Sequence, residues 1–317
     1  MLPCVSFALA DFSAELSVSL IADQRLAARG ARRKVKSFCL SELTCDKSCQ
    51  SSDMERHQIM ATQLKPDNSL EGKVSKEEWQ ARLDLAACYR IFDHLGWGES
   101  IYNHISLKVP GEKDTFLINP FGLLYDEVTA SNLVKIDVEG NNVGGSPYMV
   151  NKAGFTQHGY FHKHLGSRAD AICHVHTTAT MSVCSHKDGL LPISFYACNF
   201  QDQIGYHDFE GVTVRAEEGE RLVRNLGNHS ILMLRNHGPV VMDGTIQGMF
   251  VKMWALQRAC EIQVATLSQG EPRVVPQEVI DVHQRDLSVM ASQGGAGVFD
   301  FEAWKRRIDK IDDSWRN

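Results

Sequence analysis

The chain has 317 residues, 43% of them hydrophobic, and a formal net charge of −6 at pH 7. That length and apolar content are sufficient for one large domain with appendages. The acidic balance and the lack of a basic stripe interleaved with aromatic residues argue against a nucleic-acid partner. No run of eighteen apolar residues is present to span a membrane.

The first part of the chain, residues 1–70, is predicted to be a disordered extension. Asp11 and Glu15 interrupt its first apolar stretch, and no basic segment precedes that stretch, which argues against a secretory signal. A basic cluster at residues 25–36 leaves a transit segment open as an alternative, and a later methionine such as Met60 is a possible true start.

A well-marked helix opens the folded region, which we place at residues 71–272. Ser75, with Glu78 three residues later, forms a capping-box pattern. Apolar residues then recur at helical spacing as far as Gly96, a typical helix stop. These apolar residues are Trp79, Leu83, Ala86, Ala87, Ile91 and Leu95.

Strands and helices are then expected to alternate, which favours a three-layer α/β domain. Asn103 and His104 are placed in a turn before the first strand. The predicted strands are residues 105–109, 115–118, 133–137, 171–176, 230–234 and 239–242, and the predicted helices are 217–226 and 245–267. Residues 273–317 are predicted to form a C-terminal tail in which 299–315 is a short amphipathic helix that docks on a partner subunit.

Three histidines are candidate metal ligands. His174 and His176 lie two residues apart at the end of a predicted strand, so their side chains should point the same way while Cys173 points the other way. His237 follows a second apolar run. A His-x-His pair with one distant histidine is the ligand set of an open catalytic zinc site. The alternative is that all three are ordinary histidines near a core.

The nine cysteines are odd in number and scattered, and four fall inside predicted core elements. This pattern suits a reducing compartment better than a disulfide framework, so we expect a cytoplasmic protein. The cysteines are Cys4, Cys39, Cys45, Cys49, Cys88, Cys173, Cys184, Cys198 and Cys260.

Several segments between about residues 79 and 270 resemble, in one order, the class II aldolase and adducin head-domain family. They are closer to adducin heads and their bacterial-type relatives than to the sugar-phosphate aldolases. The resemblance implies a three-layer αβα domain with a largely antiparallel central sheet, and a homo-oligomer, often a tetramer, with sites near subunit boundaries. The segments include YNHIS at 102–106, INPFGLLYDEVT at 118–129, AGFTQH at 153–158, HVHT at 174–177, YHDFEG at 206–211 and LRNHG at 234–238.

The resemblance also implies roles for individual residues. Asn103 and Gly122 match positions near the substrate phosphate of the aldolases, although Asn103 acting only to stabilise its turn is an equal alternative. Tyr196 matches a tyrosine that the aldolases use for proton transfer across a subunit boundary.

The chain departs from the aldolases between Asn151 and His158, in a segment that is expected to lead into a further helix carrying His158 and His162. Lys152 and Ala153 stand where the aldolases carry two serines, and Gly154 stands at their acid/base glutamate. Loss of a positioned acid/base typically costs a factor of about 10²–10⁴ in rate. His158 and His162, one helical turn apart, are a candidate proton-transfer pair, but a solvated helix face is the more frequent outcome of this spacing.

The sequence therefore leaves two interpretations of function open. The first is a divalent-metal enzyme, with zinc as the ion, that acts on a small carbonyl or hydroxy-carbonyl substrate as a lyase, epimerase or dehydratase. The second is a non-catalytic, adducin-like interaction module of the actin and cytoskeleton type. The lysine-rich tail of full adducins has no counterpart here.

Overall fold

The structure is a computed structural model that describes residues 69–317, apart from 213–214, 293–294 and 296. Residues 1–68 lie outside the described part of the chain, and with them nearly all of the extension that was predicted to be disordered.

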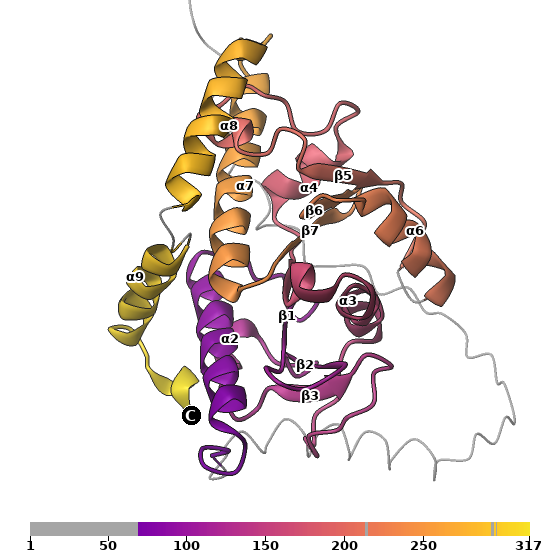
Figure 1. Ribbon diagram of the computed structural model, residues 1–317, viewed down its shortest axis with the longest axis vertical. Coiled ribbons are helices and arrows are strands. Elements are labelled where there is room, and N and C mark those ends of the chain that lie inside the picture. Colours follow the sequence, from indigo (N-terminus) through magenta and orange to yellow (C-terminus); the bar gives the residue numbers. More distant parts are fainter. Residues whose placement is uncertain (1–68, 213–214, 293–294, 296) are drawn as a thin grey trace, which may run out of the picture. The chain divides into compact units, whose positions relative to one another are not determined.

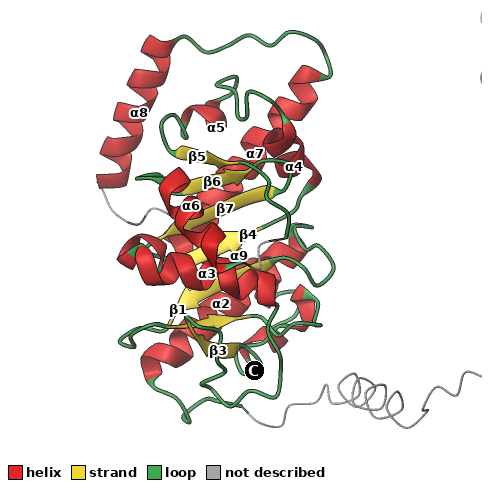
Figure 2. Ribbon diagram, turned by 90° about the vertical axis from the view of Figure 1, so that its right-hand side faces the viewer, coloured by secondary structure: helices red, strands yellow, loops and turns green. Residues whose placement is uncertain are grey.

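The described residues are built on one seven-stranded sheet in the order β3-β2-β1-β4-β7-β6-β5. Figure 2 shows the strands in this succession, with β3 and β5 at opposite ends. All neighbouring strands pair antiparallel except β5 and β6, which are parallel. The strands are β1 His104–Lys108, β2 Thr115–Ile118, β3 Val134–Asp137, β4 Ala171–His174, β5 Ile204–His207, β6 Ile231–Leu234 and β7 Gly238–Asp243.

Helices cover both faces of this sheet. Figure 1 shows α2, α7 and α9 on one side and α3 and α6 on the other. The predicted three-layer arrangement with a largely antiparallel sheet is confirmed. The helices are α2 Lys76–His94, α3 Lys152–His164, α4 Thr178–Ser185, α5 Phe195–Cys198, α6 Ala216–Leu226, α7 Ile246–Leu267, α8 Gln277–Ser292 and α9 Val298–Asp309.

Helix α2 begins where the sequence indicated. The Ser75 side chain caps it by accepting a hydrogen bond from the backbone N–H of Glu78. After the C-cap residue, Gly96 takes a φ of 72°, a left-handed conformation that suits glycine. The helix is buried on most of its circumference rather than along one stripe, because it lies between the sheet and the C-terminal segment.

Residues of the central strands alternate between two cores. Ile105, Cys173 and Val175 enter the large apolar core under α2 and α7, whereas Ile172 belongs to the smaller core under α3 and α6. Strand β1 begins at His104, one residue earlier than expected, so the placement of His104 in a turn was wrong. The antiparallel register sets His104 directly opposite His174.

The C-terminal segment packs on its own chain. Phe301, Ile308 and Trp315 are buried in the large core, and the backbone carbonyl of Trp315 accepts a hydrogen bond from Ala130. These three side chains are therefore not available to a partner subunit, and docking of the rest of the 299–315 segment on a partner stays a prediction. Helix α8 was not predicted. None of the helices in the described residues has the length and apolar character that crossing a bilayer would require.

Candidate metal centre and its pocket

Three imidazoles meet at one end of the central strands. His174 is the last residue of β4, His176 follows it, and His237 lies in the turn between β6 and β7. The Nε2 atom of His174 is 2.8 Å from Nε2 of His176 and 3.3 Å from Nε2 of His237. Among the residues that the structure describes, these three form the only group of histidine, cysteine or carboxylate ligands positioned to hold a metal ion. The sequence motif therefore predicted their convergence.

Neighbouring groups orient the three imidazoles so that their ring nitrogens can bind a cation. The Nδ1–H of His174 donates to the carbonyl of Pro239 at 2.9 Å, which leaves Nε2 with a free lone pair. Gly238 makes the close approach possible, because a Cβ there would lie 2.5 Å from the carbonyl oxygen of Val175 and 3.2 Å from the His176 ring.

The three histidines are neutral at physiological pH. Burial lowers the pKa of His174 well below its usual value, and the neighbouring imidazoles lower it further. Burial also lowers the pKa of His176, and it lowers that of His237 to about 4. Neutral imidazoles with converging lone pairs are typical ligands for zinc and similar divalent ions, so the donor set fits such a metal.

A pocket of about 420 Å³ opens over the triad. Its size is within the usual range for small-molecule sites. Besides the three histidines, the residues that line it are Glu99, Tyr102, His104, Asn151, Ala153, Gln157, Phe209, Gly211, Val212 and Asn236.

Behind the pocket wall lies a chain of buried hydrogen bonds. Ser106 Oγ is 2.7 Å from Nδ1 of His158 and 2.7 Å from Nε2 of His162, whose Nδ1 is 2.7 Å from the carbonyl oxygen of Ala169. The carbonyl can only accept, so His162 carries its proton on Nδ1 and accepts from the Ser106 hydroxyl. Ser106 in turn accepts from His158, which leaves His158 Nε2 as a bare acceptor. The expectation of a solvated helix face was wrong for both histidines, which are buried.

His104 occupies the place of a missing side chain. A Cβ added to Gly154 would lie 1.8 Å from Cδ2 of His104. Gly154, which the resemblance aligns with the acid/base glutamate of the aldolases, has no side chain, and an imidazole from β1 fills the space beside it. The His104 ring also lies 4.6 Å from that of His158 and 5.2 Å from that of His174, measured between centroids.

The other predicted site residues do not line the pocket. Asn103 is buried and donates from Nδ2 to the carbonyl of Trp97 at 2.9 Å. This contact agrees with the interpretation that Asn103 stabilises its turn. Gly122, with a φ of 99°, lies in the loop after β2. Tyr196 packs on Trp254, at 5.6 Å between ring centroids. His158 does not line the pocket, and its ring lies 4.6 Å from that of His104, which does.

Two pocket residues, His104 and Gln157, were missed in the sequence. His104 and Ser106 are two residues apart, so they lie on the same face of their strand. Only the pairing of β1 with β4 shows that this face is the one that carries His174. Gln157 gave no signal of its own beside its neighbour His158.

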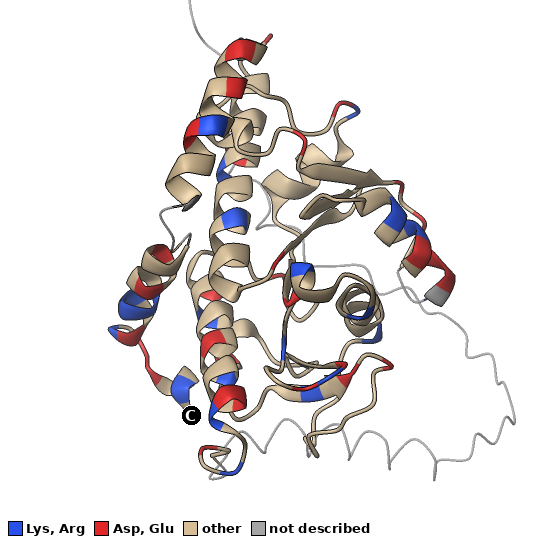
Figure 3. Cartoon of the chain, in the orientation of Figure 1, with Lys and Arg blue, Asp and Glu red and all other residues tan. Residues whose placement is uncertain are grey.

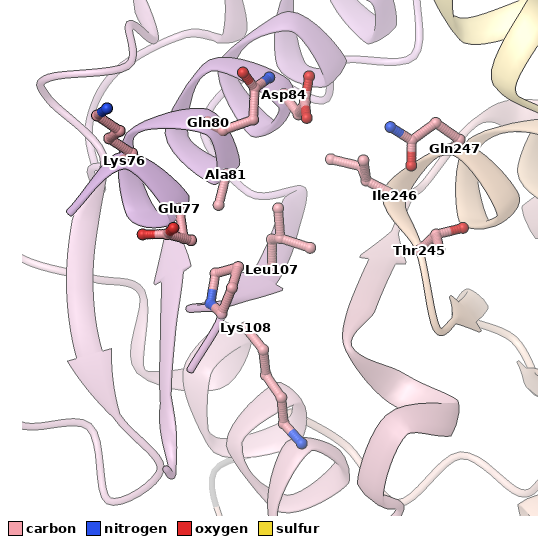
Figure 4. Close-up of a pocket in the computed structure, with 11 residues that line it drawn as sticks. Lys76, Glu77, Gln80, Ala81, Asp84, Leu107, Lys108, Thr245, Ile246 and Gln247 are labelled. Carbon is pink, nitrogen blue, oxygen red and sulfur yellow. The ribbon is translucent and has the colours of Figure 1, made fainter. Parts of the chain in front are cut away.

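A second hollow, of about 470 Å³, lies between α2, the end of β1 and the start of α7 (Figure 4). Two of its charged residues have partners elsewhere: Asp84 pairs with Lys305, and Lys108 pairs with Asp170. It contains neither converging metal ligands nor buried unpartnered atoms among the described residues, so its slightly larger volume does not make it the better candidate site.

The fold and the triad together define a class II aldolase-like α/β protein. Residues 83–264 match the profile of the family described as "Class II Aldolase and Adducin N-terminal domain". The chain belongs to this family.

Individual relatives support the assignment. Alpha-adducin of Mus musculus is 46% identical over 266 residues, which cover 78% of this chain and 36% of that protein. An aldolase II superfamily protein from Pseudomonas syringae has a similar structure, with a TM-score of 0.75, 36% identity, and coverage of 79% of this chain and all of that one. L-fuculose 1-phosphate aldolase from Glaciozyma antarctica shares the fold, with a TM-score of 0.67, 24% identity, and coverage of 81% and 99%.

Proposed function

We propose that this chain is a zinc-dependent, lyase-type enzyme that acts on a small hydroxy-carbonyl substrate, with His174, His176 and His237 as the metal ligands. The observation that supports this most strongly is the convergence of three neutral imidazole nitrogens beneath an open pocket. A divalent ion held there would supply Lewis-acid polarisation of a carbonyl oxygen.

The chain's own residues would orient the ligands and the substrate. Pro239 fixes the ring of His174 through its carbonyl, and the pocket walls set the space beside the triad. We keep His158 as a candidate for proton transfer, acting behind His104, because its Nε2 is a bare acceptor next to that ring. The glycine at position 154 leaves epimerase and dehydratase chemistry as variants of the same proposal.

A second candidate function is a non-catalytic, adducin-like interaction module. The 46% identity to alpha-adducin, over a segment that is about a third of that protein, favours it. The missing acid/base side chain at Gly154 favours it as well.

The proposed function also includes an oligomeric state and a cellular location. We propose a cytoplasmic homotetramer with sites near subunit boundaries, in which Tyr196 serves proton transfer across a boundary and Asn103 and Gly122 contribute to substrate binding. The five cysteines in the described residues are all free and buried, which suits a reducing compartment.

Metal analysis of the purified full chain is the first experiment. We expect about one zinc per chain, and its removal by chelator should abolish turnover of hydroxy-carbonyl compounds. A fully folded protein without metal, unaffected by chelator, would refute the enzyme and favour the interaction module. If the protein contains zinc but turns over no such compound, the proposed metal site stands and the proposed lyase activity does not.

A further inference from the structure

The pocket over the triad is almost free of charged side chains. Glu99 is its one carboxylate, and none of its lining residues in the described chain is a lysine or an arginine. In Figure 3 the basic residues lie mainly along helices such as α2, α6 and α9. Proteins usually hold a phosphate ester with arginine or lysine side chains or with the free N–H groups of a helix N-terminus.

Cations close to the pocket in sequence are engaged elsewhere. Arg235 stacks on the Tyr206 ring at 4.2 Å and donates to the carbonyl of His186. Arg215 and Arg221 both bond to Glu210. These guanidinium groups are therefore not directed at a pocket ligand.

The N-terminus of α3 borders the pocket, and one of its backbone N–H groups is already capped. Asn151 Oδ1 accepts the backbone N–H of Ala153 at 3.1 Å. An amide oxygen thus takes the position in which an anion would meet this N–H group. Lys152, between these two residues, is exposed and does not line the pocket.

Two polar groups in the pocket wall lack partners in the described residues. They are the side-chain Nε2 of Gln157 and Nδ1 of His104, in residues that are 3% and 4% exposed. A buried polar atom without a hydrogen bond costs about 1–3 kcal/mol, so it indicates a missing partner. The amide N–H₂ of Gln157 matches a ligand hydroxyl or carbonyl oxygen.

The rim of the pocket is apolar. Tyr102, Phe209 and Val212 are 55%, 56% and 67% exposed, and all three line it. Such a rim favours C–H surfaces of a ligand over an ionic group.

We propose that the pocket takes an uncharged hydroxy-carbonyl compound, such as a free sugar, and disfavours its phosphate ester, with Gln157 as the specificity-determining contact to a ligand oxygen. This inference rests on the function proposed above and narrows its substrate class. The carboxylate of Glu99 adds discrimination, because it repels a dianion that enters the pocket.

Calorimetry on the zinc-loaded full chain tests the inference with three matched pairs: L-fuculose and L-fuculose 1-phosphate, dihydroxyacetone and its phosphate, and glycolaldehyde and its phosphate. We expect the free compound to bind at least about tenfold more tightly in each pair that binds. Equal or tighter binding of the phosphate would overturn the inference, as would failure of every free compound to bind. Zinc content is measured separately on the chain as purified, so absence of zinc there counts against the proposed function, while the ranking within each pair still decides the substrate class.

Variants identify the residues responsible. Gln157→Leu should weaken binding of the free compound about tenfold, with zinc content unchanged and Tm unchanged or higher, because the variant removes an unpartnered buried amide. Glu99→Gln should strengthen binding of the phosphate severalfold. Matched controls come from the second hollow (Figure 4), where Gln80→Leu and Glu77→Gln should change neither affinity. Unchanged affinity in Gln157→Leu would remove Gln157 from the proposal.

Discussion

The two faces of strands β1 and β4 are built from adjacent residues but differ in chemistry. On one face, Ile105 and Cys173 are buried in the large apolar core. On the other, His104 and His174 face α3, where the pocket and the buried histidines lie. A one-residue step along either strand therefore separates a side chain that holds the fold from one that serves the candidate site.

Substitutions of two neighbouring residues on β4 should show the largest difference between the two faces. His174→Ala should abolish zinc retention and leave a folded protein, because it removes the ligand whose Nε2 lies within 3.3 Å of Nε2 of both other imidazoles. Cys173→Ala, on the opposite face, should keep about one zinc per chain and destabilise the fold by about 1–2 kcal/mol through loss of buried volume. Metal analysis and chemical denaturation of both variants provide the measurements. Zinc lost equally from both would contradict the separation of the faces.

Lowering the pH should destabilise the protein through the histidines that are buried between β1 and α3. Burial lowers the pKa of His162 to about 3, and that of His104 and His158 well below the usual range. Between about pH 6.5, where an unfolded histidine titrates, and pH 3, the unfolded chain binds protons that the native chain does not. Stability is therefore fully present above this window and is lost as the pH falls, by about 1.4 kcal/mol per pH unit for His162, and His104 and His158 act in the same direction.

Denaturation at several pH values checks the sign and the source of this loss. His162→Asn should reduce the slope by about one proton, or about 1.4 kcal/mol per pH unit. His164→Asn, on the exposed side of the same helix, controls for loss of an imidazole from α3. Identical slopes for wild type and His162→Asn would show that His162 titrates alike in the two states.

Substitution of Gly154 tests how tightly α3 packs against the His104 ring of β1. Gly154→Ala should destabilise the protein by about 1–3 kcal/mol, because the new Cβ would lie 1.8 Å from the His104 ring. The double variant Gly154→Ala/His104→Ala should recover most of that loss relative to His104→Ala alone, which a double-mutant cycle measures. Additive effects would show that the two residues do not share the space.

The sequence predicted one part of the site and missed another for a clear physical reason. His174, His176 and His237 were found because a short motif and a strand end are local signals, and the capped helix α2 was found for the same reason. His104 depends on the register between β1 and β4, which are more than sixty residues apart in the chain. That register is set by tertiary packing, which no periodicity records.

Burial of the helix α3 histidines was missed for a similar reason. A spacing of four residues shows that His158 and His162 share a helix face, but not what covers that face. Here Ser106 of β1 and the carbonyl of Ala169 supply their hydrogen-bond partners, and both come from outside the helix. Polar residues can be buried when the fold brings such partners, and a single sequence does not contain that information.

The smallest expected effect concerns the hydroxyl that links the two histidines. Ser106→Ala should destabilise the protein by about 1–2 kcal/mol, because it removes one hydrogen bond from His158 and one from His162 while the rings stay buried. Ser182→Ala, which removes an exposed hydroxyl from α4, should change stability by less than about 0.5 kcal/mol. Zinc content should not change in either variant, because Ser106 contacts no ligand of the triad. Loss of zinc from Ser106→Ala alone would mean that the buried histidine chain supports the metal centre as well as the fold.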